Sequence, residues 1–548
     1  MKFPLCLLTL LLACGSAFGQ HAAHASSNNP RPATLLKGLG RHSFPVSTES
    51  AEAQKFFDQG LILAYGFNHD EAARSFRRAA ELDPRMAMAH WGLALALSPN
   101  YNQSSISGEQ MKQGLEAVRR GLALAARAPE HERAYLEAMA KRFSDAPGAD
   151  QRALSLAYSG AMRELARRYP DDAEAATLYA DSLMILNAWK LWSPDGKPAE
   201  GTDEIVSVLE DVLRRHPEHI GAHHLYIHAV EASPHPEWAL TSAERLGGLS
   251  PAAGHLVHMP AHIYMRVGDY EAAARSNDLA AAADRAYFEA SDLRGIYAAA
   301  YYSHNLHFLA AARNMQGRYA DSMRAARQLE ENVRPYLKEM PFFESFLPTA
   351  TLTMVRFGRW DEVLREPEPP ASQPVTKALW RWARGMAYAA TGKAAEAERE
   401  LKTFQAASAA IPAEAGYGQN SARDLLKIGE HFLNARLGAA RGDRRAAVEH
   451  LRRAVAAEDA LAYDEPPGWY HPLSRESLGG ALLALGEHAE AERVFREDLR
   501  RNRRNGRSLF GLSESLKAQG KLYESQLVRR EFESAWKDAD TKLRVEDL

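Results

Sequence analysis

Histidine is concentrated in one part of this 548-residue chain. Eleven of its 21 histidines fall between His216 and His307, which is about a sixth of the sequence. Two stretches, GAHHLYIHAVEAS (221–233) and GHLVHMPAHIYMRVGDY (254–270), carry six of them, and HNLH (304–307) follows. Composition does not explain this clustering. Because neutral imidazole is a common metal ligand, these residues are candidates for a metal centre.

The spacing within the two stretches suits one face of a helix. His224 and His228, like His258 and His262, are four residues apart, the spacing at which two rings on one helix hold one ion. On a helical wheel of ~100° per residue, His255, His258 and His262 lie within about 60° of one another. The residues expected to pack lie on a separate stripe: Val257, Ala261 and Tyr264.

The elements that must position these histidines are helices in a repeated unit. Alanine, leucine, arginine and glutamate dominate, and β-branched residues are few, a mixture that favours helices. A clear copy is FFDQGLILAYGFNHDEAARSFRRAAELDP (56–84), with the small residue Gly60 in its first helix and Pro84 at its end. Further copies include QGRYADSMRAARQL, WARGMAYAATGKAAEAEREL and LGGALLALGEHAEAERVFREDL.

In these features the sequence resembles the tetratricopeptide repeat (TPR) family, whose 34-residue units are helical hairpins. The resemblance covers most of residues 46–537. It implies an all-α, TPR-like solenoid: a right-handed superhelix of about 11–12 hairpins with a concave groove built mainly from the first helices. It implies no activity, since TPR proteins are scaffolds with many uses.

A proline-rich stretch, REPEPPASQPVT (365–376), predicts a division of the repeats. We expect an N-terminal solenoid over residues 46–366 that carries the histidines, a C-terminal solenoid over residues 375–537, and a tail over residues 538–548.

Alignment with the TPR repeat places the histidines on groove-lining positions. His224, His228 and Glu231 take positions 5, 9 and 12; His255, His258 and His262 take positions 2, 5 and 9; His304 and His307 take positions 2 and 5. Equal positions predict three levels: His224 with His258 and His307, His228 with His262, and His255 with His304. Adjacent helices lie about 8–10 Å apart, so rings from neighbours meet over a common ion. Seven imidazoles and one carboxylate predict one or two transition-metal ions in the groove.

The first residues, MKFPLCLLTLLLACGSAFG (1–19), have the layout of a secretion signal. Two exits are open: cleavage before Gln20, or a bacterial lipobox, LLAC, that would lipidate Cys14. Both predict export, to the periplasm or to the outer membrane as a lipoprotein. Residues 20–45, rich in Ser, Asn, Pro and His, predict a flexible tether.

Other partners are not favoured by the composition. A net charge of −3 provides no field that would attract nucleic acid, so none is expected. No later segment approaches twenty apolar residues, so membrane contact is expected only through an N-terminal lipid. The chain also resembles a group of uncharacterised exported bacterial TPR proteins with a His-rich middle, in stretches such as MAHWGLALALSPNYN (88–102) and YDEPPGWYHP (463–472).

Export makes copper and zinc the expected ions, and the chain beyond the leader has no cysteine to offer as a thiolate ligand. Met259 and Met265 are possible thioether neighbours, so we expect copper before zinc, and zinc before iron. Metal binding should weaken below about pH 6, where imidazoles take up protons.

Three function classes are compatible with these residues. The first is a metal-dependent oxidase or hydrolase with Glu231 as a ligand or general base. The second is a protein that stores or delivers copper or zinc. The third is a TPR scaffold that binds envelope proteins, a peptide or a small molecule in its groove. Histidines fixed on rigid helices favour a defined site.

Overall fold

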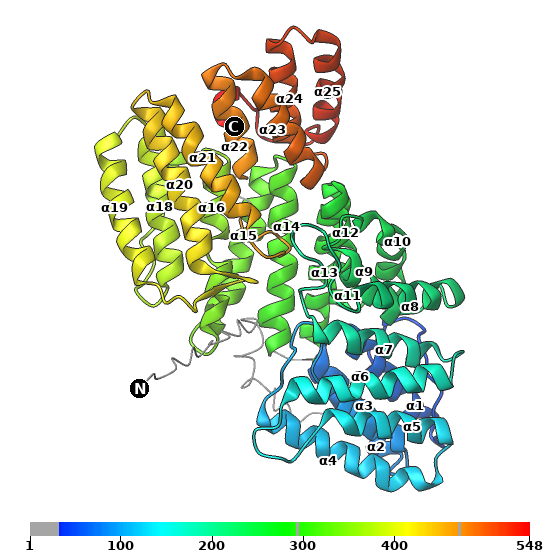
Figure 1. The fold of residues 1–548 in the computed structure, drawn as a ribbon. Coiled ribbons are helices and arrows are strands. Elements are labelled where there is room, and N and C mark those ends of the chain that lie inside the picture. The colour runs from blue at the N-terminus through cyan, green and yellow to red at the C-terminus, as the bar shows by residue number, and fades with distance from the viewer. Residues whose placement is uncertain (1–31, 292–294, 470–472) are drawn as a thin grey trace, which may run out of the picture.

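The computed structural model describes residues 32–291, 295–469 and 473–548. Within these ranges the chain forms 25 α-helices, a few short helical turns and one two-stranded hairpin (Figure 1). The expected secretion signal, the lipobox at Cys14 and the first part of the expected tether lie outside the described residues.

The helices pair in chain order as hairpins. The first six pairs are α1 (Ala51–Tyr65) with α2 (His69–Leu82), α3 (Ala87–Leu97) with α4 (Gly108–Leu124), α5 (Glu130–Met139) with α6 (Gln151–Arg168), α7 (Ala173–Leu186) with α8 (Thr202–Arg215), α9 (Ile220–Val230) with α10 (Leu240–Leu249), and α11 (Gly254–His258) and α12 (Pro260–Val267) with α13 (Tyr270–Ser291). The next six are α14 (Ser303–Met315) with α15 (Tyr319–Val333), α16 (Thr349–Arg356) with α17 (Trp360–Arg365), α18 (Pro374–Ala390) with α19 (Ala394–Ala410), α20 (Ala422–Ala440) with α21 (Arg444–Asp459), α22 (Ser474–Leu485) with α23 (His488–Arg501), and α24 (Gly506–Ala518) with α25 (Leu522–Ala535). The expected all-α, TPR-like solenoid is therefore confirmed.

Shorter elements fill the connections. The short helices are η2 (Ala125–Arg127), η3 (Ala140–Arg142), η4 (Pro236–Ala239), η5 (Ala298–Tyr302, a π-helix), η6 (Arg334–Tyr336), η7 (Pro341–Phe346) and η8 (Val545–Asp547). The strands β1 (Gly416–Tyr417) and β2 (Asn420–Ser421) pair antiparallel, with Gly416 opposite Ser421.

Local chemistry sets the ends and contacts of the helices. Ser50 begins α1, where its side chain accepts a hydrogen bond from the N–H of Ala53, and Asn68 caps α2 in the same way. Gly60 on α1 and Gly92 on α3 both face the ring of Phe76, and a Cβ at either glycine would come within 2.7 or 2.3 Å of it. Small residues at these points therefore allow neighbouring helices to approach closely.

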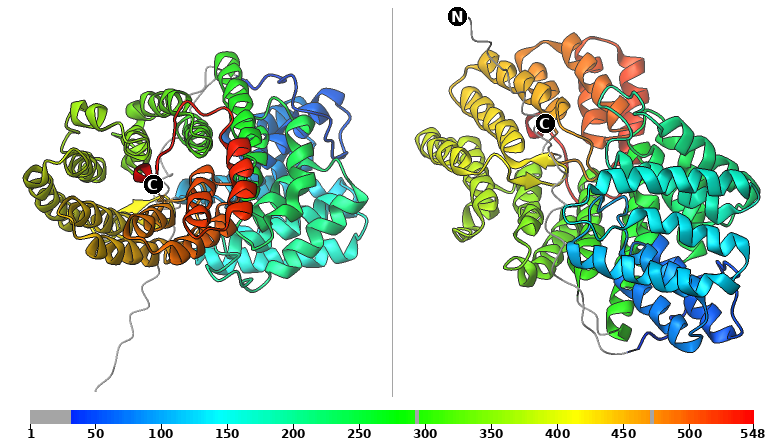
Figure 2. Two further views of the ribbon diagram at one scale, coloured as in Figure 1. Left: turned by 90° about the horizontal axis from the view of Figure 1, so that it is seen from above. Right: turned by 60° about the horizontal axis from the view of Figure 1, so that its bottom comes forward.

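The hairpins stack into a curved array (Figures 1 and 2). Helices α1 to α13 form one end, α14 and α15 lie in the middle, and α18 to α25 curve away as the other end. One buried apolar cluster runs through residues 33–263 and another through residues 352–516. The division into solenoids over residues 46–366 and 375–537 stays a prediction.

The described part of the expected tether is packed. Ala33, Leu39 and Phe44 are buried in the N-terminal core, and the backbone N–H of Leu36 donates to Gln59 on α1. Burying these three apolar side chains against the apolar core is favourable, so residues 32–45 pack as a strap on the first hairpins.

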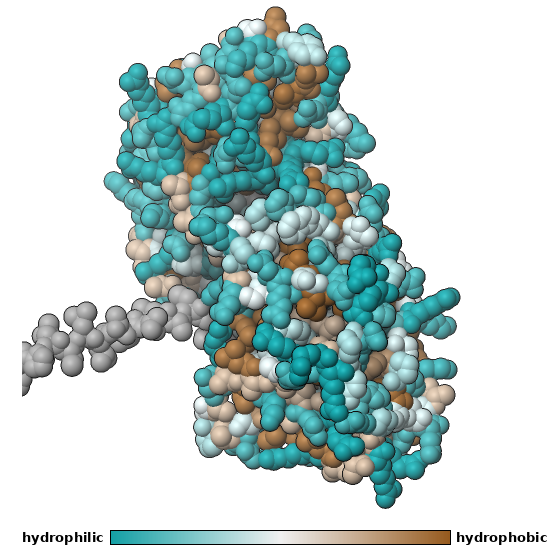
Figure 3. Space-filling model, turned by 45° about the vertical axis from the view of Figure 1, so that its right-hand side comes forward, coloured by the Kyte–Doolittle hydropathy of each residue, from teal (hydrophilic) through white to brown (hydrophobic). Residues whose placement is uncertain are grey.

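The face in Figure 3 is largely hydrophilic, with smaller hydrophobic areas between polar ones. Among the described helices, none combines the length and the apolar character that crossing a membrane requires.

Candidate metal centre

The first helices of three consecutive hairpins carry the expected ligands. His224 and His228 lie on α9, and His304 lies on α14 directly after the π-helix η5. Pro260 interrupts the backbone hydrogen bonds between α11 and α12. The backbone at Met259 remains α-helical (φ −50°, ψ −37°), so His258 and His262 still lie on the same side of the segment.

The structure brings six of the seven histidines into two groups of three. The first triad is His224, His228 and His255, and the second triad is His258, His262 and His304. In each, the nearest ring nitrogens all lie within 4.8 Å of one another. Three imidazoles around a tetrahedral ion, with Zn–N bonds of ~2.0–2.1 Å, place their nitrogens about 3.4 Å apart, so small ring movements would close each triad on an ion. His307 belongs to neither triad.

Contacts at Nδ1 indicate which nitrogen is free in two rings of the second triad. The side-chain oxygen of Asn277 lies 2.7 Å from Nδ1 of His258, and its amide donates to the carbonyl of Ala273, so the oxygen must accept from the ring. Nδ1 of His262 lies 2.5 Å from Oε2 of Glu231, outside hydrogen-bond alignment, and this closeness to a carboxylate oxygen favours a ring proton on Nδ1. With both ring protons on Nδ1, both Nε2 atoms present lone pairs, and these two atoms lie only 3.0 Å apart. Two facing lone pairs repel unless a cation lies between or beside them.

Glu231 joins the two triads. Its Oε1 lies 2.6 Å from Nδ1 of His228, its Oε2 contacts His262, and the hydroxyl of Tyr463 donates to Oε2 at 3.1 Å. A carboxylate that accepts from the outer nitrogen of a ligating histidine fixes its tautomer and strengthens it as a ligand. Burial alone would raise the pKa of Glu231, but His262 and His228 beside it hold that pKa below its usual value. Glu231 thus contacts one candidate ligand of each triad, and its expected role as a ligand or general base stays a prediction.

The first triad contains buried ring nitrogens that lack a partner. His224 donates from Nδ1 to the backbone carbonyl of Tyr65 at 2.5 Å, and its Nε2 lies 3.2 Å from Nε2 of His255. Among the described residues, Nε2 of His228 and Nδ1 of His255 have no hydrogen-bond partner. Buried polar atoms are nearly always satisfied, so each of these two nitrogens is available to a metal ion or a water molecule.

The site is more deeply buried than a groove surface would be. His224, His228, His255, His258 and His262 are between 0% and 2% exposed, and His304 and His307 are partly buried. Burial lowers the pKa of each ring for which a shift is resolved, and it does so strongly for His224, His255, His258 and His304. These rings are therefore neutral, as metal ligation requires.

The pairing of levels differs from the expectation. His224 at position 5 contacts His255 at position 2. In the same way, the ring centroid of His258 at position 5 lies 4.8 Å from that of His304 at position 2. Glu231 at position 12 contacts His262 at position 9. Each first helix is thus displaced by about three residues, nearly one turn, relative to the one before it. Of the predicted levels, only the pair of His228 and His262 lie close, with ring centroids 5.6 Å apart. The same displacement carries His307 beyond the cluster, where it contacts Phe346.

This burial changes the expected pH dependence. Rings whose folded pKa lies below the ordinary 6.5 still bind metal where free imidazoles are protonated, so we expect bound metal to persist well below pH 6, lower than the sequence alone suggests. Metal content after dialysis at stepped pH, with unfolded protein as control, measures this. The metal-free protein should lose stability as pH falls below 6.5, because the unfolded chain takes up protons that the buried rings do not. Metal loss at the same pH in folded and unfolded protein would contradict the burial.

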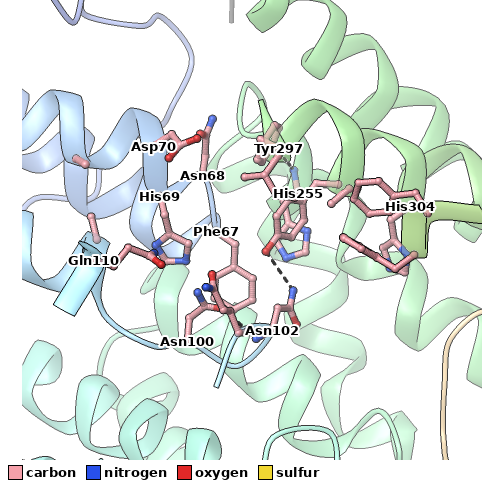
Figure 4. A pocket seen from close by; sticks show the side chains of 18 of the residues that line it. Phe67, Asn68, His69, Asp70, Asn100, Asn102, Gln110, His255, Tyr297 and His304 are labelled. Carbon is pink, nitrogen blue, oxygen red and sulfur yellow. Dashed lines mark hydrogen bonds between the residues drawn. The ribbon is translucent and has the colours of Figure 1, made fainter. Parts of the chain in front are cut away.

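The triads open on a cavity of about 580 Å³, a size suited to a small molecule. Figure 4 shows Phe67, His69, Asn100 and Asn102 on one side of it and His255 and His304 on the other. Asn102 donates to the hydroxyl of Tyr301, whose ring lies 4.9 Å from that of His255.

The C-terminal half of the chain also contributes residues to this cavity. The sequence did not predict this contribution. The loop between α21 and α22 carries Tyr463, Asp464 and Glu465 to the centre. Burial raises the pKa of Asp464 to about 7 and that of Glu465 to about 8, so both hold protons near neutral pH. The stretch YDEPPGWYHP is polar and stiffened by proline, but nothing in the sequence indicates that its Tyr463 contacts Glu231, 232 residues away. His471 in the same stretch lies outside the described residues.

Two aromatic residues with unusual backbones enclose the first triad. Phe67 (φ 54°) and Trp189 (φ 60°) occupy the left-handed region, which bulky residues avoid at a cost of about 1–3 kcal/mol. The ring centroid of each lies 5.9 Å from that of His228, and Phe67 also stacks on His255 at 5.2 Å. The fold retains this strain where the rings cover the ligands.

Replacing Phe67 by glycine should therefore uncover the first triad. Glycine adopts φ 54° without strain, which offsets part of the lost packing, so the chain should fold. We expect a soluble chelator to remove metal about tenfold faster, equivalent to ~1.4 kcal/mol of barrier. Phe67→Leu, which retains bulk, is the control and should stay close to the wild type. Equal release rates in all three would contradict a covering role.

A third group, His42, Glu174 and His219, is better explained without metal. Nδ1 of His219 accepts from the N–H of Ala222, so its proton is on Nε2, which lies 3.2 Å from Oε1 of Glu174. Nε2 of His42 lies 2.6 Å from the same oxygen. Burial alone would lower the pKa of His42, but Glu174 raises it above its usual value. The group is an ion pair that fastens the strap of residues 32–45 to α7 and α9.

No protein-family model and no curated protein sequence matches the chain. Among solved structures, it is similar to a human IFIT1 dimer with m7Gppp-AAAA, at 13% identity and a TM-score of 0.34, over 90% of this chain and 92% of that one. It is also similar to a tetratricopeptide repeat protein from Parabacteroides merdae, at 13% identity and a TM-score of 0.29, over 60% of this chain and 92% of that one. Similarity of this degree carries no functional argument and assigns no family.

Proposed function

We propose that this chain is an exported metalloprotein that binds two transition-metal ions, one in each histidine triad, and uses them to oxidise a small molecule. The observation that carries the proposal is the second triad, where two Nε2 atoms with lone pairs face each other at 3.0 Å inside the protein. The unpartnered Nε2 of His228 supports the same reading for the first triad.

Charge favours copper over zinc. Imidazoles bind a metal as neutral ligands, and Glu231 is the ionised carboxylate in contact with two of the six, His228 and His262. Two Cu(I) ions with this carboxylate leave a net charge of about +1, whereas two Zn(II) ions leave about +3, and buried net charge is costly. Copper is therefore proposed before zinc, and the place of iron after zinc stays a prediction.

Burial favours catalysis over metal delivery or scaffolding. Five of the six ligands are almost fully enclosed, which slows metal exchange, and a cavity of about 580 Å³ suits a small molecule better than a protein partner. Three imidazoles leave a coordination position open toward the cavity. A copper pair would supply dioxygen binding and electron transfer there, and the protonated Asp464 and Glu465 are placed to donate protons.

Hydrolysis is the second candidate. A three-histidine site with an open position is also a coordination pattern of catalytic zinc, which generates hydroxide from water near neutral pH. The same triads support this reaction if the native ion is zinc.

The test is to identify the native ions and then separate the two reactions. The full chain, purified without chelators, should contain copper at two ions per chain, and copper-loaded protein should consume oxygen with phenolic or amine reductants. Zinc-loaded protein that hydrolyses esters, with a copper form inert toward oxygen, would favour the second candidate. Protein that takes up neither metal would end both.

A further inference from the structure

A row of tyrosines leads from the first triad toward the surface. The ring of Tyr301 lies 4.9 Å from that of ligand His255, and Tyr297 stacks on Tyr301 with centroids 5.2 Å apart. Tyr287, on α13, lies 6.0 Å beyond Tyr297. Tyr297 is buried and Tyr287 is partly exposed, so the row connects the enclosed centre to solvent.

The inner tyrosine is also linked to the ligand through hydrogen bonds. The backbone N–H of His255 donates to the hydroxyl of Tyr297 at 3.1 Å. Tyr297 in turn donates to Oδ1 of Asp284 at 3.1 Å, while the amide of Asn305 donates to the other oxygen of that carboxyl. Gly254 makes room for this carboxyl, since a Cβ there would lie 1.9 Å from Oδ1.

The outer tyrosine has a proton acceptor of its own. The hydroxyl of Tyr287 donates to Oε2 of Glu71 at 3.2 Å. A phenol loses an electron readily only if its proton can leave at the same time. Tyr297 and Tyr287 each donate to a carboxyl group that can receive that proton when it is ionised. Burial raises the pKa of Asp284 to about 7, so part of the protein has this acceptor ionised at neutral pH, and Arg74 contacts the acceptor oxygen of Glu71.

We propose that Tyr301, Tyr297 and Tyr287 form an electron-transfer path that lets a one-electron donor at the surface reduce the metal pair without entering the cavity. This inference rests on the proposed oxidase function and names a second class of reductant for it. The donor class is a soluble one-electron reductant that is too large or too polar for the cavity, and the terminal oxidant is dioxygen or hydrogen peroxide.

Each step moves one electron inward and restores the tyrosine it leaves. Tyr297 gives an electron toward the oxidised metal pair, by way of His255 and Tyr301, and its phenolic proton to Asp284. Tyr287 then gives an electron to the Tyr297 radical, which recovers its proton from Asp284, while the proton of Tyr287 moves to Glu71. The external donor returns an electron to Tyr287, which recovers its proton from Glu71, so the net change is one electron passed from donor to metal pair.

The experiment uses the copper-loaded full chain, hydrogen peroxide as oxidant and hexacyanoferrate(II) as the donor. Rapid freezing after peroxide addition should trap a tyrosyl radical in the electron paramagnetic resonance spectrum. Tyr287→Phe should leave metal content unchanged and slow hexacyanoferrate(II) oxidation by about tenfold or more. Tyr297→Phe should also abolish the radical. Tyr302→Phe, next to Tyr301 on the π-helix η5 but outside the row, is the matched control and should behave like the wild type.

The outcomes separate this inference from the proposed function. A protein that retains copper, forms no tyrosyl radical and oxidises hexacyanoferrate(II) equally fast with Tyr287→Phe overturns the electron path alone. A protein that binds no copper overturns both. Because Tyr297 also holds the backbone of His255, Tyr287→Phe is the decisive variant: it changes no contact of a ligand.

Discussion

His258→Ala is expected to reduce bound metal from two ions to about one per chain while the helices remain formed. His258 contributes a nitrogen to the second triad and lies 3.0 Å from its partner nitrogen on His262, so its loss removes a ligand and not only a neighbour. We expect affinity at this triad to fall by more than the roughly 10–100-fold typical of an outer-shell partner. Metal analysis after equilibrium dialysis and far-ultraviolet circular dichroism measure the two quantities.

The control for this prediction is His307→Ala. His307 lies on α14 beside the same cluster but belongs to neither triad. It should retain both ions. If His307→Ala loses as much metal as His258→Ala, or if His258→Ala retains both ions, the assignment of ligands is wrong.

Glu231→Gln is expected to weaken both sites together by about 10–100-fold, because Glu231 positions one ligand of each triad. A glutamine turns an N–H₂ group toward one of the two rings whose Nδ1 atoms face residue 231, so that ring loses its acceptor and must change tautomer. That ring then offers no lone pair to its ion. Competition with a colorimetric chelator, followed for both equivalents of metal, gives the two affinities.

Glu237→Gln provides the comparison. Glu237 also contacts a histidine, His235, but Glu237 is partly exposed and His235 belongs to neither triad. The metal affinity of Glu237→Gln should therefore equal that of the wild type. If Glu231→Gln weakens only one equivalent, the bridge does not link the sites. If it weakens neither, Glu231 is not a positioning residue.

The sequence predicted the fold and the set of histidines from which the two triads are drawn, because both depend on local periodicity. Gly60 and Pro84 mark the hairpin, and the four-residue spacing of His258 and His262 survives the interruption at Pro260. The residues of one helix keep a fixed relation to one another whatever surrounds them, so a helical wheel is informative.

What the sequence did not predict depends on how separate helices pack. The displacement of about three residues between successive first helices decides that His224 meets His255 and that His307 falls outside. An alignment of repeats assumes that equal positions of successive helices lie next to each other, so it cannot predict that displacement. The approach of Tyr463 to Glu231, across 232 residues of sequence, likewise follows from the curvature of the whole array.

The most direct test of the two-triad centre is a crystal structure of the metal-loaded chain with anomalous scattering measured at the absorption edge of the bound metal. We predict two strong peaks, one about 2.0–2.1 Å from nitrogens of His224, His228 and His255 and one at the same distance from those of His258, His262 and His304. Peaks located elsewhere would contradict it. The absence of a peak at either triad in a chain supplied with the metal would also contradict it.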